Sequence, residues 1–216
     1  HAYEIYLMAD PKVSCRVTVP ILWDKQTKSI VSNESSEIIR MFNSAFNNLT
    51  GNTDDYWPQD LRDAIEPVNA RIYDTFNNGV YRSGFSTTQS AYDAAVTALF
   101  ETMDWLEERL SNSRYLMGDR LTEADWRLFA TLVRFDNVYH LHFKCNRKRV
   151  IDYPNLWAYT RELYQMPGIS ETINMEQIVR HYHYSHESVN PHRIIPINPI
   201  IDWNAPHDRD RLAKAA

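Results

Sequence analysis

The sequence predicts an α+β protein in which a small N-terminal part, a hairpin followed by one helix, precedes a larger all-helical part. Three observations lead to this prediction. β-branched and apolar residues fill 17–23, apolar residues recur at helical spacing in several runs beyond residue 60, and a polar, turn-rich segment lies between the two patterns. β-branched residues favour strands, whereas apolar residues three or four positions apart form one face of a helix.

The hairpin is predicted from its first strand at 17–23, a polar turn at 24–29 and a second strand that starts at Ile30. The Val19–Pro20 bond can adopt the cis form, because this costs only about 0.5–1 kcal/mol before proline. A cis bond would leave the N–H and C=O of Val19 free to pair with an extended peptide ligand. An ordinary proline at the edge of a sheet explains the same run equally well.

A helix is predicted after the hairpin, since Ser32 to Ser36 offer capping side chains and apolar residues follow at helical spacing up to Phe46. Glu34 and Ser35 stand where it begins. Free backbone N–H groups and the positive helix end favour a ligand carboxylate there, and the Glu34 carboxylate could hold an ammonium group. Helix capping alone accounts for the same residue types. Arg16 could bind a second carboxylate or be a solvated charge.

The rest of the chain is predicted to be helical. Apolar spacing indicates helices over 61–77, with Pro67 kinking or restarting the first, over 87–110, and near 156–165 and 175–186. Another helix starts at Thr122, where Asp125 stands in the position of a capping box. We therefore expect four parts: an N-terminal domain (1–47), a linker (48–60), an all-helical domain (61–189) and an extended tail packed over the surface (190–216).

Composition excludes several classes of function. The net charge is −5 and no continuous basic stripe is present, which argues against a nucleic-acid partner. No run of 18 or more apolar residues is present, so we predict no membrane association. Two cysteines are too few to cross-link a domain of this size, which favours a reducing compartment. We expect a cytoplasmic protein.

Longer runs make the sequence similar to one known family. It resembles the glutathionyl-hydroquinone reductases, the Xi class of glutathione transferases. The matching runs follow the order of that family over nearly the whole chain: RVTVPILWD (16–24), SNESSEIIR (32–40), NNGVY (77–81), LTEAD (121–125), VRFD (133–136), HFKC (142–145), and YHYSH (182–186) leading to Asn190-Pro191.

This resemblance implies a partial thioredoxin-like domain followed by an all-α glutathione-transferase C-terminal domain, usually in a homodimer. It implies glutathione as co-substrate, no metal, and the reduction of glutathionyl-hydroquinones to hydroquinones. In that family a cysteine thiolate attacks the glutathione sulfur and the hydroquinone leaves. A second glutathione then releases the enzyme from the mixed disulfide.

Residue roles are implied by the same resemblance. Tyr81 corresponds to the proton donor and acceptor at the departing aromatic carbon, and Tyr139 and Tyr182 face the nucleophile and favour its thiolate. A phenol with an ordinary pKa near 10 can perform either role in a dry pocket. The resemblance implies that the glutathione site is formed by Arg16, Val17, Thr18, Val19, Glu34 and Ser35.

The sequence departs from the family at the nucleophile. The family's cysteine lies in a Cys-Pro-Trp-Ala-His-Arg type of motif, which these 216 residues lack. Neither Cys15 nor Cys145 is a convincing substitute, although basic residues beside Cys145 could lower the pKa of its thiol. We expect the chain to begin after the motif, to be inactive alone, and to require its own missing N-terminal segment.

Two alternatives to the reductase are a metal site and a non-catalytic binding module. Side chains of metal-ligating type are present, but only His183 and His186 share a helical face, so no metal site is predicted; the set is His140, His142, Cys145, His181, His183 and His186. The second functional hypothesis is a non-catalytic, glutathione-transferase-like module that binds thiols or partners. The joint presence of Tyr81, Tyr139 and Tyr182 favours the reductase, because a binding module does not need three phenols around a leaving group.

Overall fold

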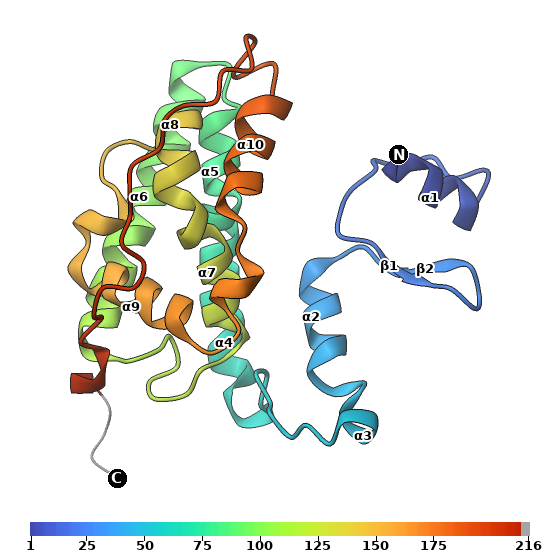
Figure 1. Cartoon of the computed structure of the whole chain (residues 1–216), viewed down its shortest axis with the longest axis horizontal. Coiled ribbons are helices and arrows are strands. Elements are labelled where there is room, and N and C mark those ends of the chain that lie inside the picture. Colours follow the sequence, from blue (N-terminus) through green and yellow to red (C-terminus); the bar gives the residue numbers. More distant parts are fainter. Residues whose placement is uncertain (213–216) are drawn as a thin grey trace. The chain divides into compact units, whose positions relative to one another are not determined.

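The computed structural model describes residues 1–212 (Figure 1). These residues divide into two compact units, His1–Pro58 and the residues from Gln59 onward, and each has its own architecture. The division falls inside the predicted linker. The proposed four-part domain organisation remains a prediction.

The N-terminal unit contains a two-stranded antiparallel sheet and three helices: α1 (Ala2–Ala9), β1 (Leu22–Asp24), β2 (Ser29–Ser32), α2 (Ser35–Ser44) and α3 (Asn47–Thr50). The hairpin pairs Trp23 with Ile30 and Asp24 with Ser29. The predicted hairpin and the helix after it are therefore present.

The first strand is shorter than the sequence predicts. It starts at Leu22, because Thr18 donates its backbone N–H to the Tyr6 hydroxyl and accepts from that hydroxyl through its carbonyl, instead of pairing with β2. The Val19–Pro20 bond is cis, which is one of the two possibilities that the sequence left open. Helix α1 was not predicted, and α3 occupies the start of the predicted linker.

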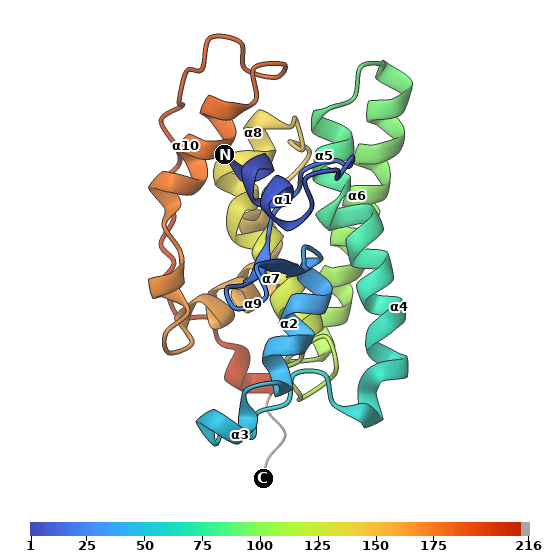
Figure 2. The same cartoon turned by 90° about the vertical axis from the view of Figure 1, so that its right-hand side faces the viewer.

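The regular elements of the second unit are helices, apart from two isolated β-bridges within Tyr115 to Arg120 (Figure 2). Its α-helices are α4 (Arg62–Ile72), α5 (Gly79–Gly84), α6 (Gln89–Asn112), α7 (Glu123–Arg134), α8 (His140–His142), α9 (Pro154–Gln165) and α10 (Met175–Ser185). Helix α4 continues through Pro67 without restarting. Two π-helical segments, Tyr73–Asn77 and Phe135–Tyr139, join α4 to α5 and α7 to α8, respectively.

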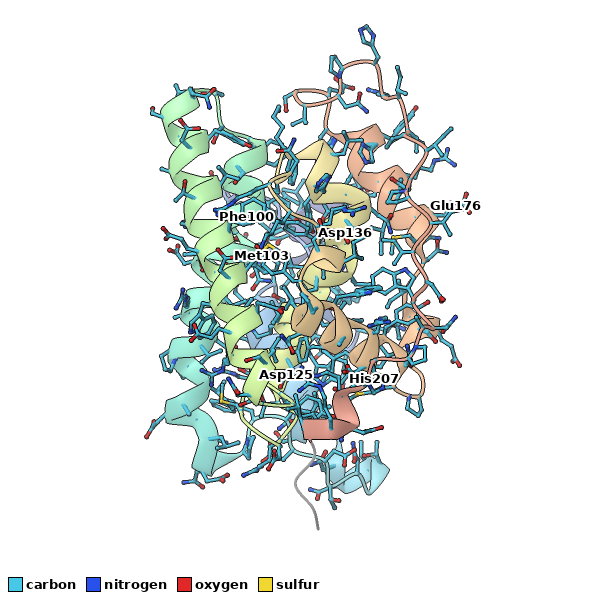
Figure 3. All side chains as sticks on the ribbon, turned by 90° about the vertical axis from the view of Figure 1, so that its left-hand side faces the viewer. Phe100, Met103, Asp125, Asp136, Glu176 and His207 are labelled. Atoms are coloured by element: carbon cyan, nitrogen blue, oxygen red, sulfur yellow. The ribbon has the colours of Figure 1, made fainter. Side chains whose placement is uncertain are left out.

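The core of this unit lies between α6 and the helices around it. Phe100 and Met103 project from α6 into the interior and are almost completely buried (Figure 3). The predicted capping box at the start of α7 is confirmed: the Thr122 N–H donates to Asp125 Oδ2 at 2.8 Å. The other Asp125 oxygen accepts from the Tyr159 hydroxyl and from the Leu116 N–H. This carboxylate therefore joins α7, α9 and the loop after α6.

Within the described residues, the tail contacts the helical unit near Trp203 and Arg209. Trp203 lies against Trp157 and Tyr164, with ring centroids 5.2 and 5.1 Å apart. Arg209 is fully buried, and its guanidinium donates to the carbonyl oxygens of Leu110 and Ser113 at 2.6 and 2.7 Å. The tail thus binds the C-terminal end of α6. Within residues 1–212, no helix is both long and apolar enough to span a lipid bilayer.

Candidate functional site

Three tyrosines from distant parts of the sequence meet in the helical unit. Tyr81 comes from α5, Tyr139 ends the second π-helical segment, and Tyr182 comes from α10. The Tyr182 hydroxyl lies 2.6 Å from the Tyr81 hydroxyl and 2.8 Å from the Tyr139 hydroxyl. We call these three residues the tyrosine cluster. The structure therefore brings together the three tyrosines singled out from the sequence.

The tyrosine cluster is mostly shielded from water. Tyr139 and Tyr182 are only 2% and 7% exposed, whereas Tyr81 is half-buried. Burial, together with the neighbouring hydroxyls, raises the pKa of Tyr139 far above its ordinary value, and burial also raises the pKa of Tyr182. Both phenols are consequently neutral hydrogen-bonding groups at physiological pH.

The π-helical segments set the direction of two members of the tyrosine cluster. Phe76 and Phe135, one from each segment, stack with their ring centroids 5.8 Å apart. Asn77 fixes the first segment to α7 by donating its side-chain amide to the Thr131 hydroxyl at 2.6 Å. Such wide turns are frequent near functional sites because they redirect the side chains after them. Here they precede Tyr81 and include Tyr139.

Close packing against α5 fixes a further aromatic ring. Phe143 is fully buried and lies 5.4 Å from Tyr81 and 5.7 Å from Tyr139, measured between ring centroids. A Cβ atom at Gly84 would come within 2.0 Å of Phe143 Cδ1, so only glycine leaves room for the ring. Sequence reasoning missed this pair; Phe143 and Gly84 carry no signal beyond ordinary core residues.

The predicted glutathione residues lie in the N-terminal unit. Thr18 is tied to Tyr6 and to Asn33, whose side-chain amide donates to Thr18 Oγ1 at 2.9 Å and to the Tyr6 hydroxyl at 3.0 Å. This network joins the segment before Val19 to the residue before Glu34. Tyr6 and Asn33 were not predicted, although Asn33 stands inside the run that contains Glu34.

The ligand-facing groups in this unit are accessible. The side chains of Arg16, Val17, Val19, Glu34 and Ser35 are exposed, and within residues 1–212 the backbone N–H and C=O of Val19 have no hydrogen-bond partner. Glu34 is the residue that precedes α2, but its side chain makes no capping hydrogen bond. Helix capping alone therefore does not account for its side chain.

Cys145 does not have the environment of a reactive thiol. Cys145 is fully buried, and burial raises the pKa of its thiol to about 12. Its basic sequence neighbours do not offset this desolvation. Cys15 is exposed, on the segment that precedes the hairpin. Among residues 1–212, no three His, Cys, Asp or Glu side chains are arranged to hold a metal ion.

Comparison with known proteins adds independent findings. The family model for the C-terminal domain of glutathione S-transferases matches residues 89–162. The chain is 55% identical to glutathionyl-hydroquinone reductase YqjG of Escherichia coli K12, over 96% of this chain and 63% of the relative. It is 54% identical to glutathionyl-hydroquinone reductase PcpF of Sphingobium chlorophenolicum, over 92% of this chain and 64% of the relative. The chain thus spans less than two thirds of these two curated relatives.

Solved structures agree with these relatives. The glutathione-bound structure of YqjG, a glutathione transferase homolog from Escherichia coli K-12, matches with a TM-score of 0.95 at 55% identity, over 97% of this chain and 68% of the other. Glutathione transferase Xi 1 from Trametes versicolor matches with a TM-score of 0.90 at 52% identity, over 93% and 70%. The α+β fold with a thioredoxin-like part and a helical C-terminal domain is thereby confirmed.

Proposed function

The chain belongs to the Xi-class glutathione transferase family, and we propose that the complete protein reduces glutathionyl-hydroquinones to hydroquinones at the expense of glutathione. Two curated relatives bear the name of this activity. The observation that supports it most directly is the tyrosine cluster, because an aromatic leaving group needs a proton donor held in a dry site.

The burial of the three hydroxyls in the tyrosine cluster suggests an order in which they donate hydrogen bonds. Each hydroxyl has one proton to donate. Tyr139 is the most buried member, and its hydroxyl donates best to Tyr182, which can then donate to Tyr81. The Tyr81 proton is then free to point out of the cluster toward a substrate. This order assigns proton donation to Tyr81 and support to the two buried phenols.

The proposed reaction proceeds in two balanced steps. A cysteine thiolate attacks the sulfur of the glutathionyl-hydroquinone, a sulfur–sulfur bond forms, and the carbon–sulfur bond breaks with its electron pair moving to the ring carbon. Tyr81 protonates that carbon. A glutathione thiolate then attacks the mixed disulfide, which releases oxidised glutathione and restores the cysteine thiolate. The proton lost by the second glutathione thiol restores Tyr81. Over the complete cycle the glutathionyl-hydroquinone is reduced to hydroquinone, and two glutathione sulfurs are oxidised to the disulfide.

The N-terminal unit would hold the glutathione part of the substrate. An exposed peptide group at Val19 can pair with the extended tripeptide, and Glu34 can bind its ammonium group. Ser35, at the first turn of α2, offers a hydroxyl and a backbone N–H to a carboxylate. Arg16 provides the positive charge for a second carboxylate. Val17 and Thr18 complete the proposed site, and Thr18 is held by Tyr6 and Asn33.

The nucleophile would come from residues outside this chain. Cys145 is buried with a raised pKa, and a thiol in that state is a poor nucleophile at neutral pH. We therefore propose that the 216 residues alone are inactive and require an additional N-terminal segment of the same protein. We further propose a cytoplasmic homodimer that needs no metal.

The function is tested by supplying the complete protein with a glutathionyl-hydroquinone and glutathione. We expect free hydroquinone and oxidised glutathione in a one-to-one ratio, both quantified by liquid chromatography. Tyr81→Phe should lower the rate by about 10²- to 10⁴-fold, the usual contribution of general acid catalysis. Tyr73→Phe, at an exposed tyrosine, is the matched control. Binding of the conjugate without product would instead identify a non-catalytic binding module.

A further inference from the structure

Three histidines that the proposed reaction does not use meet beside the tyrosine cluster. His142 comes from α8, His183 from α10, and His186 directly follows the end of α10. His142 Nε2 lies 3.1 Å from His186 Nδ1, and the His142 and His183 ring centroids are 4.7 Å apart. We call these residues the histidine cluster. They converge although only two of them share a helical face.

The histidine cluster is largely withdrawn from water. His142 and His183 are 5% and 3% exposed, and the Nε2 atom of His183 is buried without a hydrogen-bond partner among the described residues. Burial lowers the pKa of His142 to about 4 and also lowers the pKa values of His183 and His186. All three rings are therefore neutral at physiological pH, unlike exposed histidines that titrate near 6.5.

The histidine cluster touches the residues that hold the tyrosine cluster. His186 stacks on Phe143 at a centroid distance of 5.7 Å and lies 5.6 Å from the ring of Tyr182. Phe85 closes the other side, 5.2 Å from His186. The end of α10, which carries Tyr182, is thus joined to α8 through the imidazoles, and to α5 and the second π-helical segment through the tyrosine hydroxyls.

The surrounding charges disfavour additional protons on these rings. Lys144 acts on His142, and His181 acts on His186; both would repel a charged imidazole. Glu187, beside His186, is engaged by Arg193, and Arg134 faces Tyr182. A hydrogen bond from His183 to the backbone of Asn137 opposes these effects. The other titratable neighbours are Tyr81, Tyr139 and Tyr182.

We propose that the histidine cluster positions Tyr182 by joining the end of α10 to α8, and that protonation of the cluster releases this end of the helix. The contact between His142 and His186 requires one N–H and one lone pair. When both facing nitrogens carry protons, two donors oppose each other and the contact is lost. An opened helix end exposes the rings to water, where they bind protons more readily, so acid shifts the equilibrium toward the open form.

Hydrogen–deuterium exchange of the complete protein tests this proposal. Backbone amides of 182–190 should lose protection by roughly tenfold between pH 7.5 and pH 5, after correction for intrinsic exchange, because exposed histidines take up protons in this range. Amides of Leu99 and Leu106 in α6 should not change, which separates local release from general unfolding. Equal loss in both segments would overturn the proposal.

Matched variants locate the response. His142→Gln and His186→Gln keep a polar side chain that does not titrate, so each should reduce the pH dependence at 182–190. His192→Gln, at an exposed histidine beyond the end of α10, should leave it intact. A full response in both cluster variants, or its loss in the control, contradicts the proposal. This response is independent of whether the protein acts on glutathionyl-hydroquinones.

A measurement on the unmodified protein covers the case in which the variants fail to fold. Nuclear magnetic resonance titration of the histidine ring protons should give His142 a pKa well below the ordinary value near 6.5. The His142 titration should coincide with a shift in the Tyr182 ring signals. Ordinary titration of His142 near 6.5, or no change at Tyr182, would refute the positioning role.

Discussion

Tyr182 holds the middle position of the tyrosine cluster, so its hydroxyl serves two partners at once. Tyr182→Phe would leave the buried Tyr139 hydroxyl without the oxygen that lies 2.8 Å away. We expect a loss of about 1–3 kcal/mol in the free energy of unfolding, the usual cost of an unsatisfied buried polar group. Urea unfolding measures it. Tyr184→Phe, at an exposed tyrosine of the same helix, should change it by little, and equal effects would contradict the assignment.

Gly84 gives a second prediction at the scale of one residue. Gly84→Ala places a methyl group 2.0 Å from Phe143 Cδ1 and should destabilise the protein by about 1–3 kcal/mol or more, because a buried ring and a helix must separate. Gly79→Ala is the control, since its Cβ would meet Leu99 at an ordinary 3.7 Å. Thermal unfolding distinguishes them. A Gly84→Ala variant as stable as Gly79→Ala would refute close packing here.

Individual residues differ in how far the sequence predicts them. The Thr122–Asp125 capping box was predictable because its partners are three positions apart. The convergence of Tyr139 and Tyr182 depends on tertiary packing, and resemblance to a family, not spacing, suggested it. Phe143 and the histidine cluster also stand in runs that resemble the family, but the resemblance assigned them no role. Their roles arise from contacts that no local pattern encodes.

The buried carboxyl group of Asp136 binds backbone N–H groups in the segment after α8. Asp136 accepts hydrogen bonds from the Val150 and Ile151 N–H groups at 2.6 and 3.2 Å, and burial raises its pKa to about 6 (Figure 3). Because an unfolded Asp titrates near 3.9, the folded state holds a proton that the unfolded state has lost between these two values. Rising pH therefore removes stability across this window.

Asp136→Asn removes this titration. The parent loses stability from pH 4 to pH 6 and the variant does not. The free energy of unfolding of the variant minus that of the parent should therefore rise over this range, by an amount on the order of 2 kcal/mol. Asp152→Asn is the contrasting control: hydrogen bonds from Arg149 lower the pKa of Asp152, so its loss should cost stability above pH 4 and none at lower pH. Urea unfolding at several pH values measures both. Parallel pH curves for Asp136→Asn and its parent would contradict the raised pKa.

Elements were predictable where they are long and amphipathic. Helices α6, α9 and α10 lie within a few residues of their predicted bounds. Helix α1 was missed because it is short and buries only Tyr6, whose partner Thr18 is remote in sequence. The two π-helical segments also escaped notice, since an extra residue per turn leaves no clear trace in apolar spacing.

At the scale of the whole molecule, the C-terminal tail holds the helical unit together through Arg209. Its buried guanidinium donates to carbonyl groups at the end of α6 and lies 3.6 Å from Glu162. Arg209→Met should cost about 1–3 kcal/mol, because it leaves carbonyl groups at the end of α6 without their buried donor, whereas Glu162 keeps its ion pair with Arg114. Arg211→Met removes an exposed ion pair and should cost less than about 1 kcal/mol. Denaturant titration compares them, and similar losses would argue against anchoring by Arg209.

The division into a mixed part and a helical part was predictable from the sequence. The attachment of the tail to the helical unit through Arg209 was not. Composition and periodicity indicated a small mixed part and a helical part, and the tail was expected to be extended. The burial of Arg209 could not be foreseen, because this residue stands among charged residues in a proline-rich tail, where surface residues are expected. Its burial depends on carbonyl groups about a hundred positions earlier.

The two π-helical segments make the position of Tyr81 and Tyr139 sensitive to the number of residues before them. Each wide turn accommodates a residue that an ordinary α-helix would not. Forcing regular α-helical pitch on Tyr73–Asn77 without removing a residue would rotate the next helix by about 100°. Tyr81 would then turn away from Tyr182 although no side chain had been altered. In this protein, the length of a turn is as much a part of the site as the chemistry of its phenols.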